Sequence, residues 1–466
     1  MSTVSPAPIL AFVVVILLIL KQPVLKVPFA SNFFKNRRGL SSVKIDYGMA
    51  PIIGVFILLA TSSINEETVV RGIVGTDTIR PYSILILFMA LAYLCISLDL
   101  KGFFAYLALV ATKAAGDSGK RLFLYFFLLT SFLTVFTSND IVILTMTPII
   151  YYFAKNTKTD PIPFLLAQFF AANIWSIALY IGNPTNIIVA QAYNLSFLEY
   201  SRWMILPTIF AGTSCLALLW LIFRKRIPDR IENPNRDPES ALVDRDGAVF
   251  GTINLVACLI MLSLSSWLVV PIWAIPLFFA FVVFASDSLP HHVTRKRENA
   301  SADPMGSKSA LKRMPWKIAP FVTGLFIMVE SLSVSGWVDV FASSLSKVSG
   351  DLPTAVLVMG FASSFASNLM NNQPMTILFT RILQSSAFTV TPEVQRGAMF
   401  ALVLGSNFGA NFTLIGALAG IMWAKMLYDK GVTVSFKEFS KYGFLIMPVV
   451  VALACLALVI QLMVSP

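Results

Sequence analysis

The chain has 466 residues, of which 57% are hydrophobic and only 13% charged, and its mean hydropathy is +0.77. These values lie outside the range of soluble domains and predict an all-α polytopic membrane protein. The net charge of +11 does not indicate a nucleic-acid partner, because the basic residues gather in a few loops between apolar segments, as the positive-inside rule describes.

The basic loops assign a direction to each apolar segment. The largest lie at 21–44, 224–245 and 295–317, and we place all three in the cytoplasm. About 20 apolar residues cross a hydrocarbon core, which predicts spans at 8–20, 48–64, 81–98, 203–223, 249–268, 271–286, 318–334 and 442–463. Amphipathic helices in the membrane interface are expected at 99–115 and 338–349.

The segment 122–154 does not fit a single crossing. Its 33 residues would make a straight helix of about 50 Å against a core of about 30 Å, and its only formal charge is Asp140. Basic residues flank both ends, so both ends are expected in the cytoplasm. We therefore predict a re-entrant hairpin that folds back at 137–140, with its polar tip in a protein-enclosed cavity inside the membrane.

The following segment, 163–192, carries a second interruption, IGNPTNIIVA, in which Pro184 breaks the helix. The same pair of features recurs later in the chain. A hairpin at 354–385 is interrupted by SNLMNNQPM, and a span at 397–427 is interrupted by GSNFGANFTLIG. A hairpin followed by a broken helix thus occurs twice, with opposite predicted orientation.

The two sets of breaks have similar spacing: 44 residues separate Asn139 from Asn183, and 40 separate Asn371 from Asn411. Paired breaks in inverted halves indicate a transport site near the midplane of the membrane. We expect two inverted repeats and four parts of the chain: 1–47, an N-terminal helix and basic loop; 48–223, the first repeat; 224–270, a cytoplasmic loop and linking helix; and 271–466, the second repeat, with a cytoplasmic loop at 287–317.

Asp140 has two interpretations. It could cap the half-helix that begins at Ile141, together with Asn139, or it could bind and release a proton or hold a cation. Amides and hydroxyls at the other breaks both donate and accept hydrogen bonds, which suits an uncharged hydroxylated solute, whereas half-helix N-termini would favour an anion. Such side chains also join neighbouring helices. The candidate substrate- and ion-binding residues are Asn139, Asp140, Asn183, Thr185, Asn186, Asn371, Asn372, Asn411 and Thr413.

Other chemistry finds little support in the sequence. Four cysteines lie singly in apolar segments, so we expect no metal site and no cofactor. The stretch AAGDSGKR lacks the spacing of a phosphate-binding loop, and an enzyme is not expected. Asp99 and Lys101 are expected to mark a cytoplasmic boundary. Glu330 could be an intramembrane acid or could reach the outer interface.

Four stretches carry a family resemblance: GKRLFLYFFLLTSFLTVFTSNDIVILTMTPII, IGNPTNIIVA, SNLMNNQPM and GANFTLIGALAGIMWAKMLYDKGVTVSFKEFSKYG. They resemble the arsenite permease family of the ion transporter superfamily, from about residue 81 to the C-terminus. The resemblance implies export of trivalent arsenic or antimony as hydroxides, usually by proton antiport and sometimes with a partner ATPase. Silicon exporters, sodium-proton antiporters and, more distantly, divalent-anion symporters are related to that family, but the symporter Ser-Asn-Thr signature is absent from both tips.

The leading hypothesis from the sequence is a secondary active exporter of a neutral metalloid hydroxide, arsenite or antimonite, coupled to protons through Asp140. A silicic acid exporter and a sodium-proton antiporter are alternatives, and a non-transporting receptor or scaffold is an alternative from another class. The expected partners are a small inorganic solute, a coupling proton or cation and the lipid bilayer of a plasma or cell inner membrane. A homodimer and a partner ATPase are both compatible with the sequence.

Overall fold

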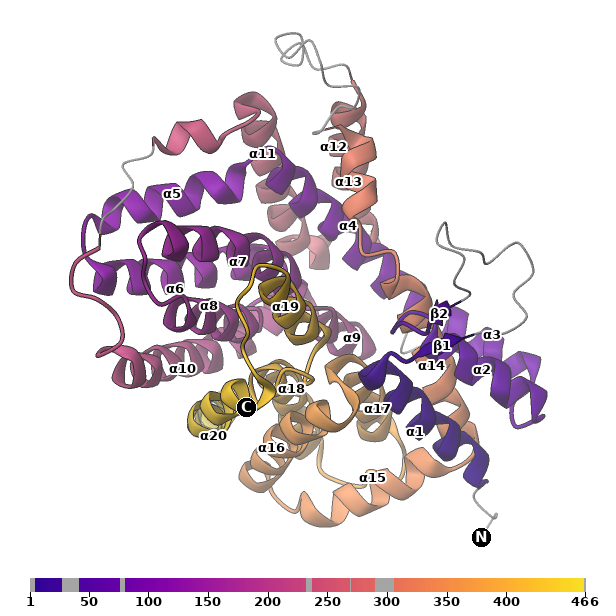
Figure 1. Cartoon of the computed structure of the whole chain (residues 1–466). Helices are drawn as coiled ribbons and strands as arrows, with labels where there is room; N and C mark the ends of the chain where they lie inside the picture. The colour runs from indigo at the N-terminus through magenta and orange to yellow at the C-terminus, as the bar shows by residue number, and fades with distance from the viewer. Residues whose placement is uncertain are drawn as a thin grey trace.

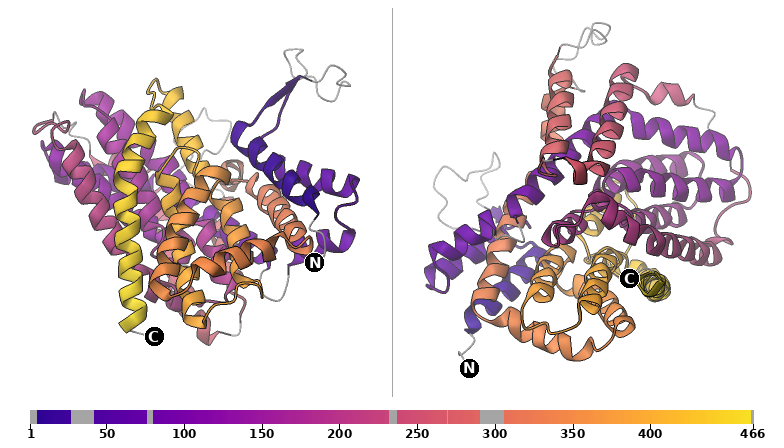
Figure 2. Two further views of the ribbon diagram at one scale, coloured as in Figure 1. Left: turned by 90° about the horizontal axis from the view of Figure 1, so that it is seen from below. Right: turned by 180° about the vertical axis from the view of Figure 1, so that it is seen from behind.

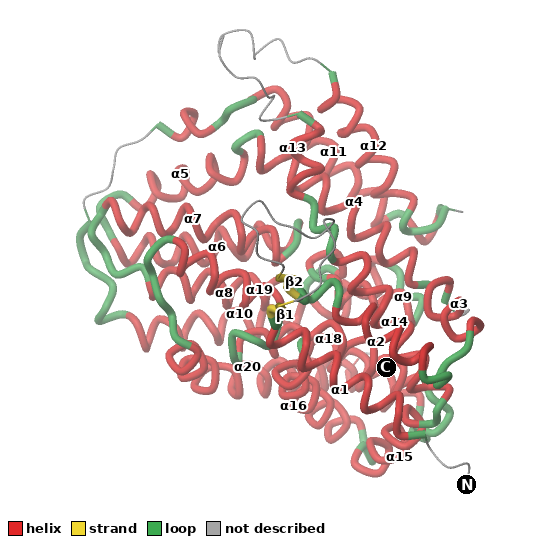
Figure 3. Tube along the Cα trace, turned by 45° about the vertical axis from the view of Figure 1, so that its right-hand side comes forward, coloured by secondary structure: helices red, strands yellow, loops and turns green. Residues whose placement is uncertain are grey.

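A computed structural model of the protein describes residues 5–26, 42–75, 80–231, 237–268, 270–289 and 306–464. Helices carry nearly all of the described structure. The exception is a short antiparallel ribbon of β1 (Val24–Lys26) and β2 (Ser42–Lys44), which the sequence did not predict (Figure 3). Most of the basic loop between these strands lies outside the described residues.

The helices of the first half follow the predicted order with one addition, α3, which lies between the segments expected at 48–64 and 81–98 and was not predicted. They are α1 (Pro6–Lys21), α2 (Ala50–Ala60), α3 (Glu66–Val74), α4 (Pro81–Leu100), α5 (Phe103–Ala115), α6 (Gly119–Phe136), α7 (Asn139–Asn156), α8 (Ile162–Trp175), the 3-10 turn η2 (Tyr180–Gly182), α9 (Pro184–Ala192) and α10 (Phe197–Phe223).

The linker and the second half continue the series (Figure 1). Their elements are η3 (Pro238–Ala241), α11 (Arg245–Ser263), η4 (Ser265–Trp267), α12 (Ala274–Ser288), α13 (Ser307–Arg313), α14 (Ile318–Val334), α15 (Trp337–Val348), α16 (Leu352–Met370), α17 (Asn372–Gln384), α18 (Pro392–Phe408), η6 (Gly409–Asn411), α19 (Leu418–Asp429) and α20 (Phe436–Val464).

Several of these helices can cross a membrane. Six are long and apolar enough, namely α4, α6, α10, α11, α16 and α20, and α13 with α14, bent by 40°, would make a seventh. The expected spans at 8–20 and 48–64 are helices of 16 and 11 residues, about 24 and 17 Å long, so each is shorter than the hydrocarbon core. The chain leaves α2 through a polar turn in which Ser62 has a positive φ of 52°.

Both predicted hairpins are present as helix pairs. The chain turns between α6 and α7 at Thr137 and Ser138, and α6 and α7 both pack against α8. In the second half it turns between α16 and α17 at Asn371, which has a positive φ of 72°, and both helices pack against α18. The predicted fold-back at 137–140 therefore lies where the sequence placed it.

The broken helices differ from the prediction in one respect. The interruption after α8 begins at Ser176, five residues before the expected IGNPTN stretch. The side-chain amide of Asn186 donates to the backbone carbonyls of Ser176, at 2.8 Å, and Leu179, at 3.4 Å. These bonds supply partners for carbonyl groups that a continuous helix would have satisfied itself, which explains how the break can be buried and longer than expected.

The helices form two groups that we name here. The core group comprises α6 to α9 and α16 to α19, and within it α9 packs on α17 and α18, and α7 packs on α19. The frame group comprises α2 to α4 and α11 to α14, where α4 packs on α12 and α14 packs on α2 and α3. Figure 2 shows α20 as a long rod on one side of the protein, with α1 to α3 at the opposite edge.

Candidate functional site

An asparagine at the end of α18 joins the two broken helices. The side-chain oxygen of Asn407 accepts hydrogen bonds from the hydroxyl of Ser176, at 2.9 Å, and the amide of Asn183, at 2.8 Å. Its amide nitrogen donates to the side-chain oxygen of Asn186, at 2.7 Å. All four residues are nearly inaccessible to solvent. The predicted residues Asn183 and Asn186 therefore bind a partner more than 200 positions away in the sequence.

A second chain of amides runs from the first hairpin tip to the other broken helix. Asn139 donates to Asn173 at 2.9 Å, and Asn173 donates to Asn411 at 2.9 Å. Asn411 in turn donates to the backbone carbonyl of Phe170 at 3.3 Å. Asn173 is thus the connection between two predicted site residues, on α8.

The second hairpin tip is tied to the segment between η6 and α19. The backbone amide of Asn372 donates to Gly416 O at 3.0 Å, and the side chain of Asn371 donates to Ile415 O at 3.4 Å. Thr413 donates to the side-chain oxygen of Asn368 at 2.5 Å. The side-chain oxygen of Asn371 is buried and has no partner among the described residues, so this tip is only partly satisfied.

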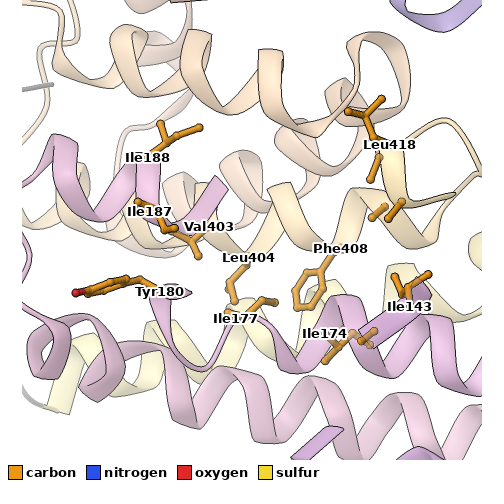
Figure 4. Close-up of a cluster of buried hydrophobic side chains, with 14 of the residues drawn as sticks. Ile143, Ile174, Ile177, Tyr180, Ile187, Ile188, Val403, Leu404, Phe408 and Leu418 are labelled. Atoms are coloured by element: carbon orange, nitrogen blue, oxygen red, sulfur yellow. The ribbon is translucent and has the colours of Figure 1, made fainter. Parts of the chain in front are cut away.

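Apolar side chains enclose these amides. Figure 4 shows Ile143 of α7, Ile174 of α8, Phe408 of α18 and Leu418 of α19 gathered where the core-group helices meet, and each is at most 5% exposed. Water does not compete for amides that are buried among apolar side chains. An amide that loses its partner there destabilises the fold by its full free energy of desolvation. The network (Asn139, Asn173, Ser176, Asn183, Asn186, Asn407 and Asn411) therefore holds the two breaks together.

Asp140 lies outside this network. Its carboxylate forms no hydrogen bond or ion pair with any residue that the structure describes, and it lines a cavity of about 520 Å³. The N-cap position of α7 is Ser138, which makes no side-chain capping bond, and the Asn139 side chain points its amide to Asn173. Neither residue expected to cap the half-helix does so through its side chain.

The cavity separates the two groups of helices. Its core-group walls come from α7 and α19. Its frame-group walls come from α4, α13, α14 and Tyr47, three residues before α2, and Ala105 of α5 completes the lining. The lining is mostly apolar and includes Phe88, Ile96, Leu144, Ile318, Leu418 and Met422. At one end lie Asp99 and Arg313, which form an ion pair at 3.0 Å. The Arg313 side chain is 57% exposed, so this end of the cavity reaches the protein surface.

Two further charged clusters lie away from the cavity. Lys101, expected to mark a boundary, is fully buried and bonds to Asp287 of α12 at 2.7 Å; Ser97 and Tyr93 also donate to that carboxylate, at 2.7 and 2.9 Å. This cluster joins α4 to α12. The Lys101 ammonium group is therefore paired inside the frame group, and its place at a cytoplasmic boundary stays a prediction.

Glu330, for which the sequence left two interpretations open, is 3% exposed and binds two arginines. Arg381 of α17 donates to it at 2.8 Å, and Arg71 of α3 lies 3.2 Å away. This cluster ties the second hairpin to the frame group. Neither charged cluster was recognisable from the sequence, since the partners come from distant segments.

The sequence-predicted residues thus fall into three sets. Asn139, Asn183, Asn186 and Asn411 are members of the amide network, and the Thr185 hydroxyl lies 3.3 Å from the Ser406 hydroxyl beside it. Asn371, Asn372 and Thr413 surround the second tip. Asp140 alone faces the cavity. Sequence reasoning missed Asn173 and Asn407; the only signal was a single asparagine in an apolar run for the first and a place inside the GSNFGAN stretch for the second.

Comparison with known proteins identifies the family. The model of the citrate transporter family, CitMHS, matches residues 6–395. The chain belongs to this family. It is therefore an integral, multi-pass membrane transporter and not an enzyme.

Its relatives agree with the resemblance read from the sequence. The arsenical pump membrane protein of Escherichia coli is 28% identical over 420 residues, which is 88% of this chain and 93% of the relative. The putative arsenical pump membrane protein of Bacillus subtilis is 25% identical over 428 residues, 86% of this chain and 92% of that one. The predicted relationship to arsenite permeases is confirmed.

A solved structure shares the fold. The crystal structure of the YdaH transporter of Alcanivorax borkumensis, described as having an unusual topology, covers 97% of this chain and 96% of its own, with a TM-score of 0.53 and 11% sequence identity. The chain therefore shares the all-helical fold of that transporter.

Proposed function

We propose that the protein exports a neutral metalloid hydroxide, arsenite or antimonite, in exchange for protons that bind to Asp140. The names of its relatives support the solute class. The observation that carries the proposal is the state of Asp140: a lone carboxylate, without a described partner, in a cavity between two groups of helices. A carboxylate in that position can take up and release a proton without breaking a structural ion pair.

Two inverted repeats, at 48–223 and 271–466, are part of this proposal. The order of interfacial helix, hairpin and broken helix occurs in both halves. In addition, α5 and α15 each begin at a glycine with left-handed backbone, Gly102 with φ 86° and Gly336 with φ 83°. A residue with a Cβ rarely adopts this conformation, so both halves use the same device to turn the chain from a span into an interfacial helix.

The cavity favours a neutral solute over an anion. The family model is described as a citrate transporter, which makes a carboxylate the competing substrate. A tricarboxylate needs cationic partners, yet Arg313, the basic residue of the described lining, is already paired with Asp99. Asp140 adds a negative charge to the same space. An uncharged hydroxide avoids this repulsion and can hydrogen-bond to a carboxylate.

The basic loops place the Arg313 end of the cavity on the cytoplasmic side. In the proposed cycle, a solute enters from the cytoplasm while Asp140 gives up its proton there, and a shift of the core group against the frame group moves Asp140 to outside access. There Asp140 is protonated again and the solute leaves. Since the cavity walls belong to both groups, such a shift would close the cavity on one side.

The test uses inverted membrane vesicles containing the full chain, with an imposed proton gradient and no ATP. We expect uptake of antimonite accompanied by proton movement, and loss of both in Asp140→Asn. Asp229→Asn, whose carboxylate is 80% exposed, is the matched control and should transport normally. Full proton-coupled uptake by Asp140→Asn would contradict the proposal.

Three further solutes in the same vesicles separate the alternatives. Uptake of citrate would favour the competing carboxylate substrate, and uptake of silicic acid would favour the silicon exporter. Sodium-driven movement of protons in the absence of any metalloid would favour the antiporter. Uptake of antimonite that needs ATP and not a proton gradient would indicate a partner ATPase.

A further inference from the structure

The polar side chains of the cavity can be sorted by their partners. Among the described lining residues they are Tyr47, Asp99, Asp140, Thr145 and Arg313. Asp99 and Arg313 are paired with each other, and the Thr145 hydroxyl donates to a backbone carbonyl of its own helix at 2.9 Å. The Tyr47 hydroxyl and the Asp140 carboxylate remain, and neither has a described hydrogen-bond partner. They come from different groups of helices.

The sequence around Tyr47 holds its ring in place. Asp46 accepts hydrogen bonds from the backbone amides of Gly48, at 3.0 Å, and Met49, at 3.2 Å, and its other oxygen binds Lys317 at 2.5 Å. A Cβ at Gly48 would lie only 3.0 Å from the Lys317 carbonyl, so the corner is packed directly on the start of α14. This corner belongs to the frame group.

The ring itself is also buttressed. It packs edge-on against Phe321, with ring centroids 5.5 Å apart and an interplanar angle of 89°. Burial, and then the negative charges of Asp140 and Asp46, raise the pKa of Tyr47 to about 12. The phenol therefore keeps its proton at cellular pH, and its hydroxyl remains a hydrogen-bond donor as well as an acceptor.

We propose that Tyr47 is a solute-binding residue, and that a small neutral hydroxylated solute binds in this cavity between the Tyr47 hydroxyl and Asp140. The inference rests on the proposed function and names its binding site. A hydroxide of this kind carries several donors and acceptors, so it can accept from the phenol and donate to the carboxylate at the same time. The remainder of the lining is mostly apolar, so it offers few other hydrogen-bonding partners to such a solute.

In this proposal the residues that bind the solute are different from the residues that hold the helices together. The asparagines of the network are each at most 2% exposed, and among the described residues every one of their side-chain amide groups is bonded except the buried oxygen of Asn139, so a solute could reach the bonded groups only by breaking those bonds. Tyr47 and Asp140 offer free groups on the cavity wall. Because Tyr47 belongs to the frame group and Asp140 to the core group, the pair faces the solute only when the cytoplasmic cavity is open. Tyr47 thus contributes to binding of the solute from the cytoplasmic side.

Initial rates of antimonite uptake into inverted vesicles, in which the cytoplasmic face meets the medium, test this. For Tyr47→Phe we expect KM to rise about threefold to tenfold, the worth of one hydrogen bond, with kcat and the number of protons per solute unchanged. Tyr82→Phe is the matched control, because Tyr82 is 38% exposed and does not line the cavity; its KM should equal that of the parent chain. Antimonite binding to the purified full chain should weaken by the same factor.

The outcomes distinguish the two proposals. If the unmodified chain takes up no neutral hydroxide, the proposed function is wrong. If it does, and Tyr47→Phe has an unchanged KM, only the assignment of Tyr47 fails. A fall in kcat and in thermal stability without a change in KM would show a structural role for the ring and would also overturn the assignment.

Discussion

Replacing Asn407 with leucine tests whether the amide network holds the two broken helices together. Asn407 is inaccessible to solvent and serves three side chains at once: it accepts from Ser176 and Asn183 and donates to Asn186, at 2.7 to 2.9 Å. Leucine has a similar shape but no polar atoms. The substitution leaves the Asn183 amide and the Asn186 side-chain oxygen buried without this partner, whereas the Ser176 hydroxyl can still donate to the Asn173 carbonyl at 2.9 Å.

The magnitude follows from the two groups that lose their partner, the Asn183 amide and the Asn186 side-chain oxygen. Each buried polar group left unpaired costs about 1–3 kcal/mol, and the groups share one site, so the costs do not add fully. Asn186 keeps its bonds to Ser176 O and Leu179 O, and Asn183 keeps its bond to the Thr185 amide. We expect a loss of about 3–5 kcal/mol in the free energy of unfolding.

The measurement is reversible unfolding of the purified full chain in mixed micelles, followed by circular dichroism as the denaturing detergent increases. Asn254→Leu is the matched control: Asn254 is 8% exposed, and among the described residues its side chain donates only to the Phe250 carbonyl of its own helix, at 2.8 Å. That variant should lose at most about 1 kcal/mol. Equal losses in the two variants would refute the view that these bonds join the halves.

Two further predictions concern the charged clusters. Lys101→Met should destabilise the purified chain by about 3–5 kcal/mol, because the Asp287 carboxylate stays buried without its cationic partner. The double variant Lys101→Met with Asp287→Leu should be more stable than Lys101→Met alone. Thermal unfolding of both variants checks this, and a double variant that is less stable would contradict it. Glu330→Ala should lower thermal stability more than Arg71→Ala. It removes the carboxylate that binds both arginines, whereas Arg71→Ala removes a partner that is 48% exposed and keeps the buried Glu330–Arg381 pair. The reverse order in thermal unfolding would contradict the assignment of Glu330 as the centre of that cluster.

Some of the fold could be read from local sequence. The apolar segments predict helices because their composition suits lipid, and α14 has the expected bounds, 318–334. Pro184 and the polar stretch before it predict a break because proline cannot continue a helix. The hairpin tip at 137–140 follows from length, since 33 residues are too many for one crossing, and from the basic residues at both ends of the segment. These features depend on residues close together in the chain.

The partners of the polar side chains could not be read in the same way. Asn183 and Asn407 are 224 positions apart, and an asparagine can bond to any helix that comes near it, so the sequence could not say that Asn183 serves the network and not a solute. The same reason explains why Tyr47 was missed: it precedes the segment that carries the family motifs, and only packing on α14 brings it to the cavity of Asp140.

The sequence by itself determined that this protein is a helical membrane transporter with polar interruptions in both halves, because hydropathy, loop charge and helix breaking are properties of short stretches. The tertiary structure decided which of the residues at the interruptions have side chains without a hydrogen-bond partner and which are bonded to other helices. It pairs most of the asparagines with one another and leaves Asp140 and Tyr47 on the walls of the same cavity. Such pairings depend on how distant segments pack, and this is settled only when the two halves of the chain come together.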